Sequence, residues 1–191
     1  YGAQVQALLK KAAALDIEKI CALHGPVLSE NLAHYLDLYN KWSSYTPEKD
    51  GVMIAYASIY GNTKKAAELL YDKLKAKNVD VIITDLARCD MSKAISDAFA
   101  YGKLVLATPT YNADVFPFMR TFIEGLTERN YQKRTVAFIE NGAWAPMAAK
   151  VMAGMFEKSK ELNILDKTVK ITCALNDASV AQIGELAEEL A

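Results

Sequence analysis

The chain has 191 residues, and its 52% hydrophobic and 24% charged content supports one packed domain plus an appendage and argues against disorder. Its 22 basic and 23 acidic residues give a formal net charge of -1, which argues against a nucleic-acid or anionic-membrane partner. Three cysteines without a C-x-x-C pair argue against a disulfide framework and a zinc site. They favour a reducing compartment, which we take to be the cytoplasm. No apolar run approaches the ~20 residues of a membrane helix.

The first 45 residues lack a regular pattern. They predict a helix over 3–14, a short apolar strand at 17–23 and a second helix over about 28–42. His24 stands between the strand and a Gly-Pro turn with no second metal ligand near it, so by residue type alone it is a packed or surface histidine. Residues 46–51 are polar and indicate a linker. Because the chain begins with Tyr1 and not Met, we expect it to be a piece of a longer protein.

From residue 52 onward, β-rich runs alternate five times with helical patterns. The strand candidates are nearly continuous apolar runs, as expected for parallel strands covered on both faces. Five such units in series predict an α/β fold with a parallel sheet and helices on both sides. The expected strands are 52–57, 79–84, 103–108, 134–140 and 167–172, and the expected helices are 63–77, 92–99, 116–126, 146–162 and 179–191.

The loop after the first strand reads "SIYGNT", residues 58–63, and leads directly into a helix. Ligands of open parallel sheets bind outside the carboxyl ends of the strands, where backbone N–H groups of a helix N-terminus favour an anion. The loop has neither the G-K-[ST] of a Walker loop nor the spacing of G-x-G-x-x-G. Taken alone, Thr63 is as consistent with a helix cap as with a phosphate site.

Two further strand ends carry aromatic residues, in "TPTYN" (108–112) and "ENGAW" (140–144). Singly, Tyr111 and Trp144 are typical of packing. Together, at successive strand ends, they predict a frame for a flat aromatic ring whose edge is bonded by backbone groups. A phosphate loop without lysine and two aromatic loops favour flavin mononucleotide (FMN).

These three loops resemble the cofactor loops of flavodoxin-like domains. The resemblance covers residues 51–191 and implies a doubly wound five-stranded parallel sheet with strand order 2-1-3-4-5. Tyr60 stands where independent flavodoxins commonly have a second threonine, so only its backbone N–H is expected to serve the phosphate. The implied cofactor-binding residues are Ser58, Ile59, Tyr60, Gly61, Asn62, Thr63, Pro109, Thr110, Tyr111, Asn112, Asn141, Gly142, Ala143 and Trp144.

The stretches "IAYASIYGNT", "ATPTYNADVFPFM" and "ENGAWAP" further resemble the flavin domain of flavodiiron proteins, also called A-type flavoproteins. In that family a metallo-β-lactamase-like diiron domain comes first, and its last segment resembles residues 20–42. The resemblance implies that 1–45 is the remnant of a diiron domain, 46–51 the linker and 52–191 the flavin domain. It makes His24 a metal ligand in a full-length protein only, because the family's other ligands have no counterpart here.

The resemblance also implies the function. Electrons would pass from a rubredoxin or similar donor through FMN to a diiron site that reduces O2 or NO, a site lying in the partner subunit of a homodimer. The chain would be part of an oxidoreductase without its terminal catalytic site, and no residue is assigned as catalytic. The alternatives are a flavodoxin electron carrier or a flavodoxin-like NAD(P)H:quinone reductase.

Two readings outside electron transfer are weaker. A signalling receiver domain needs an acidic pair after the first strand and an aspartate ending the third, where this chain has Ser58-Ile59 and Thr108. A nucleotide-sugar or phosphate-binding module remains as the least specific alternative.

Overall fold

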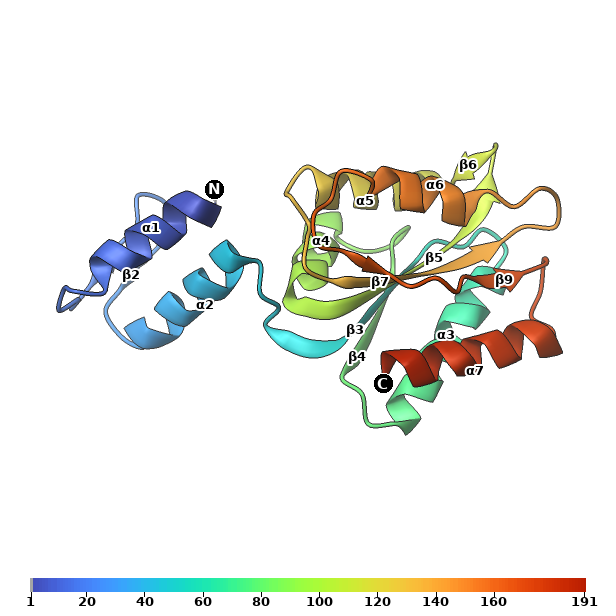
Figure 1. Ribbon diagram of the computed structural model, residues 1–191, viewed down its shortest axis with the longest axis horizontal. Coiled ribbons are helices and arrows are strands. Elements are labelled where there is room, and N and C mark those ends of the chain that lie inside the picture. The colour runs from blue at the N-terminus through green and yellow to red at the C-terminus, as the bar shows by residue number, and fades with distance from the viewer. Residues whose placement is uncertain (1) are drawn as a thin grey trace. The chain divides into compact units, whose positions relative to one another are not determined.

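The computed structural model describes residues 2–191, which form two compact units, 2–48 and 49–191 (Figure 1). Each unit is internally packed, and the polypeptide passes from one to the other at Glu48. In the described part of the chain no helix is both long and apolar enough to cross a membrane.

The N-terminal unit is a pair of helices joined by a short hairpin. Helix α1 (Gly2–Ala12) and helix α2 (Leu32–Ser44) flank strands β1 (Ile20–Cys21) and β2 (Val27–Leu28), which pair antiparallel. The Gln6 amide donates hydrogen bonds of 2.9 and 2.8 Å to Asn40 Oδ1 and Ser43 Oγ, which tie the helices together. The expected helices are present, whereas the strand is shorter than 17–23. Neither helix contains a fully buried residue.

The second unit is built on a parallel sheet. Its five principal strands are β3 (Lys49–Tyr56), β4 (Val81–Asp85), β5 (Tyr101–Tyr111), β7 (Thr135–Asn141) and β9 (Val169–Ile171). Its strands run in the order β4-β3-β5-β7, and β9 pairs with β7 at the far edge, which is the expected order 2-1-3-4-5. Strand β8 (Asn163–Ile164) pairs with the start of β7 and so precedes β9 along the same edge.

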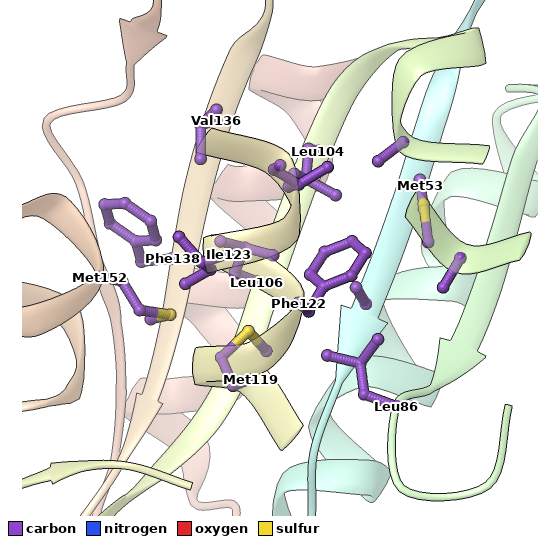
Figure 2. Packing of buried hydrophobic residues seen from close by; sticks show 14 of the residues in the cluster. Met53, Leu86, Leu104, Leu106, Met119, Phe122, Ile123, Val136, Phe138 and Met152 are labelled. Atoms are coloured by element: carbon purple, nitrogen blue, oxygen red, sulfur yellow. The ribbon is translucent and has the colours of Figure 1, made fainter. Parts of the chain in front are cut away.

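Helices cover both faces of this sheet, as the continuous apolar runs predict (Figure 1). One face carries α3 (Asn62–Ala76) and α7 (Asp177–Leu190), and the other carries α4 (Met91–Ala100), α5 (Pro117–Thr127) and α6 (Ala148–Met155). Successive strand residues alternate between the two cores, because side chains of a strand point to opposite faces. Figure 2 shows the α4–α6 core, where Phe122, Met119 and Leu106 pack together without solvent exposure.

Three differences from the expected elements have a clear structural reason. Strand β3 begins at Lys49, inside the expected linker 46–51, because this residue already pairs with Tyr101 of β5. The helix expected over 146–162 ends at Met155, because the chain then turns so that Phe156 is buried in the core and residues 163–164 can form β8. Strand β6 (Asp114–Val115) was not expected, and it folds back antiparallel on the end of β5.

The packing of α5 makes a first prediction. Phe122→Ala removes a fully buried ring and should lower the free energy of unfolding by about 3–5 kcal/mol through lost burial and the cavity left behind. Phe118→Ala is the matched control, because this ring on the same helix is 41% exposed and should cost about 1 kcal/mol or less. Urea denaturation of the two variants measures both values, and equal losses would contradict the packing described.

Candidate functional site

Three loops meet at the carboxyl edge of the sheet. The register pairs Tyr56 of β3 with Ala107 of β5, and Pro109 of β5 with Asn141 of β7. The chain segments that follow these strands therefore leave the sheet side by side, at the edge where open parallel sheets bind ligands. The sequence placed its candidate residues on these same three segments.

The loop after β3 forms an open helix N-terminus. Ser58 Oγ accepts a hydrogen bond of 3.1 Å from Gly61 N, and Gly61 adopts a left-handed φ of 87° just before α3 begins at Asn62. A Cβ placed on Gly61 would meet no atom within 4 Å, so the space beside this residue is empty. The first N–H groups of a helix have no partner within the helix and favour an anion there. The loop thus fits a phosphate group.

Below this loop, Asn141 joins three parts of the site. Its Nδ2 donates to Thr63 Oγ1 at 3.3 Å and to the backbone oxygen of Cys173 at 3.1 Å. Asn141 and Thr63 are both buried, at 7% and 2% exposure. Both amide hydrogens of Asn141 are therefore engaged by the protein, and what this side chain does is hold α3, β7 and the segment after β9 together.

The second and third loops present aromatic side chains to solvent. Tyr111 is 48% exposed and makes an edge contact with Phe116, with ring centroids 5.4 Å apart. Trp144 is 90% exposed and lies in the loop between β7 and α6. Large exposed aromatic side chains at adjacent strand ends fit a flat ring system, which would cover their apolar faces.

The polar side chains near these aromatic residues are bonded to the start of α6. Thr110 Oγ1 accepts hydrogen bonds from Met147 N at 2.9 Å and from Ala148 N at 3.2 Å. Glu140, only 4% exposed, accepts one from Ala149 N at 3.1 Å through Oε2. Thr110 was expected to line the ring, and its oxygen also accepts hydrogen bonds from the start of this helix. Glu140 was not expected at all, although an acidic residue ending an apolar strand before a helix is a usable signal.

The other predicted residues lie on the same loops. Ile59 and Tyr60 are exposed, Tyr60 by 91%, and Asn112 has a left-handed φ of 52° in the turn between β5 and β6. The remaining predicted residues are half-buried or exposed in these loops, at positions Asn62, Pro109, Gly142 and Ala143. The structure thus brings all fourteen predicted cofactor residues to one edge of the sheet.

His24 belongs to the N-terminal unit and not to the three loops. It is an exposed residue of the turn between β1 and β2 in the N-terminal unit. Within residues 2–191 the structure contains no group of three or more His, Cys, Asp or Glu side chains arranged to hold a metal ion.

Two ionisable groups near the loops have shifted pKa values. Hydrogen bonds from Arg120 hold the pKa of Asp114 below its usual range, and this pair lies just after the turn that carries Tyr111 and Asn112. Burial, together with the negative charge of Asp85, raises the pKa of Tyr56 at the end of β3 to about 12.

Comparison with known proteins agrees with this geometry. Residues 54–178 match the family model described as Flavodoxin, and the chain belongs to the flavodoxin family. An uncharacterized protein of Methanocaldococcus jannaschii is 29% identical over 100% of this chain and 49% of its own length. An anaerobic nitric oxide reductase flavorubredoxin of Enterobacter is 28% identical over 67% of this chain and 27% of its own length.

Two solved structures share the fold over the whole chain. They are rubredoxin oxygen:oxidoreductase from Desulfovibrio gigas, with a TM-score of 0.89 and 20% identity, and the flavodiiron protein from Giardia intestinalis, with 0.91 and 17%. The chain covers 48% and 47% of those two proteins, and so spans about half the length of the relatives it matches. Family and fold together support FMN as the cofactor of the three loops, and the open helix N-terminus and exposed rings fit it.

The raised pKa of Tyr56 predicts that the free energy of unfolding falls at alkaline pH. A raised folded pKa means that stability is fully present below about pH 10, where the unfolded tyrosine ionises, and is lost as pH rises toward about 12. Burial also raises the pKa of Tyr131, so Tyr56→Phe should make the decline shallower without abolishing it. Urea denaturation between pH 9 and 12 measures this, and identical slopes for both proteins would contradict it.

Proposed function

We propose that this chain is the FMN-binding, electron-transferring part of a flavodiiron protein. The observation that carries the proposal is the meeting of an open helix N-terminus with two exposed aromatic residues, Tyr111 and Trp144, at one sheet edge. The likeness of the entire chain, N-terminal unit included, to flavodiiron structures supports the wider assignment.

In this proposal the chain's own residues bind and orient the cofactor. The first N–H groups of α3, from Asn62 onward, hold the phosphate, and Ser58 keeps the loop in shape through its bond to Gly61 N. Tyr111 and Trp144 flank the ring from the second and third loops. Asn112, Gly142 and Ala143 supply backbone groups to its edge, except for the Gly142 N–H, which bonds to Ile171 O. When bound, FMN supplies electron transfer, so the protein's contribution is position and electrostatics without an acid–base residue.

The longer protein would complete the electron path. Residues 1–45 would be the end of a diiron domain, with His24 a metal ligand only there, and the diiron site used would lie in the other subunit of a homodimer. A rubredoxin-like donor is supported by the name of the Desulfovibrio gigas protein. O2 and NO are both supported as substrates, the first by that name and the second by that of the Enterobacter relative.

A flavodoxin electron carrier or an NAD(P)H:quinone reductase is the second candidate. The observation that favours it is the family match to residues 54–178, which requires nothing of the N-terminal unit. Mixing the FMN-loaded chain with NADPH and a quinone separates the two. Sustained NADPH oxidation supports the reductase, whereas rapid reduction by reduced rubredoxin without NADPH oxidation supports the flavodiiron assignment.

FMN binding itself is tested with the aromatic residues. Trp144→Ala should weaken FMN binding by about tenfold, because one aromatic contact contributes about 0.5–1.5 kcal/mol beyond its buried area. Quenching of flavin fluorescence during titration measures the dissociation constant. Trp42→Ala is the control, since Trp42 is a half-exposed tryptophan of the N-terminal unit that bonds to Glu48. A wild-type chain that binds no FMN would refute the proposal.

The phosphate loop is tested at Gly61. Gly61→Ala should cost about 1–2 kcal/mol of stability through its left-handed φ, and should also weaken FMN binding, because the added methyl enters the space kept for the phosphate. Gly25→Ala is the matched control: this glycine also has a positive φ, 124°, and open space beside it. Thermal denaturation and FMN titration are compared, and equal FMN affinities for the two variants would exclude a phosphate at Gly61.

A further inference from the structure

The loop that carries Trp144 is held at both of its ends. At its start, Gly142 N donates a hydrogen bond of 3.0 Å to the backbone oxygen of Ile171 in β9. At its end, Met147 N and Ala148 N donate to Thr110 Oγ1. Between these points Trp144 is 90% exposed, so the protein holds the loop by its backbone and leaves the ring without cover.

Thr110 is also the residue directly before Tyr111. Its hydroxyl therefore joins the two loops that present aromatic rings, one after β5 and the other after β7. The approach is close, because a Cβ on Gly142 would lie 3.4 Å from Thr110 Oγ1 and 3.2 Å from Pro146 Cβ. A side chain at position 142 would therefore crowd Pro146 in its own loop and touch Thr110 of the neighbouring strand.

Glu140 completes the attachment on the same face of the sheet. Its Oε2 accepts from Ala149 N, so three successive N–H groups at the start of α6 bond to side chains of β5 and β7. Met147, the N-cap of α6, makes no side-chain cap bond of its own. The first turn of this helix thus depends on side chains from the sheet, and Thr110 supplies two of the three bonds.

We propose that Thr110 is a positioning residue that couples the Tyr111 and Trp144 loops, so that the backbone segments carrying the two rings are held together before the cofactor arrives. The proposal rests on the proposed FMN site for its purpose, but the coupling is a property of the free chain. Loops that are already ordered lose less conformational entropy when the cofactor binds, and this gain disappears when the hydroxyl is removed.

The first test uses the chain without FMN. The chain has two tryptophans, and Trp42→Phe leaves Trp144 as the only one that fluoresces. In that background Thr110→Val, which keeps the side-chain shape but removes the acceptor, should lower the steady-state fluorescence anisotropy of Trp144. Thr110→Ser should restore it. Thr127→Val is the matched control, because Thr127 Oγ1 also makes two hydrogen bonds, to Ile123 O and Glu124 O within α5.

The second test measures coupling in FMN binding with a double-mutant cycle. Thr110→Val should weaken binding about tenfold, but Thr110→Val with Trp144→Ala should be little weaker than Trp144→Ala alone, because a ring that is absent needs no positioning. Thr127→Val should bind as the wild type does.

The outcomes separate the two proposals. Unchanged anisotropy in Thr110→Val, or additive losses in the cycle, overturns the coupling while the FMN site stands. Failure of the wild-type chain to bind FMN refutes the proposed function, and the anisotropy of the free chain still decides whether Thr110 couples the loops. Lower anisotropy that Thr110→Ser restores supports the inference.

Discussion

The parallel register of β3, β5 and β7 is the constraint on which the rest of this structure depends. It brings the carboxyl ends of three strands to the same edge of the sheet, so that loops distant in sequence leave the sheet together. The register is held by burial on both faces, since each strand alternates its side chains between the α3–α7 core and the α4–α6 core. A slip of one residue would exchange the two sets of side chains between those cores and would separate the loops.

The buried and half-buried polar side chains at that edge form hydrogen bonds within the protein. Asn141 joins Thr63 to the segment after β9, and Thr110 and Glu140 hold the start of α6. Because buried polar groups are costly without partners, these bonds make the loops rigid. The groups left for a ligand are backbone N–H groups at a helix N-terminus and the faces of exposed rings, which is what a phosphate and a flat ring require.

Prediction from sequence succeeded where a signal is local. The continuous run from Val52 to Ala57 identifies a doubly covered strand, and "SIYGNT" identifies a loop entering a helix. Prediction was wrong where contacts between segments distant in sequence decide where an element begins or ends. Strand β6 exists because Asp114–Val115 folds back on β5, and α6 stops at Met155 because the following residues are needed by the core and by β8. Neither partner is visible from the local pattern.

The sequence by itself determined the alternation of strands and helices, the loops at which we propose that a ligand binds and, through resemblance, the strand order and FMN. Apolar runs and glycine turns carry that information within a few residues. Only the tertiary structure decided the use of individual side chains at the site. Thr110 and Asn141, which the sequence predicted as cofactor residues, also bond to other parts of the protein, while Glu140 had no expected role. A hydrogen bond depends on which donor lies opposite, and that is settled only when distant strands meet.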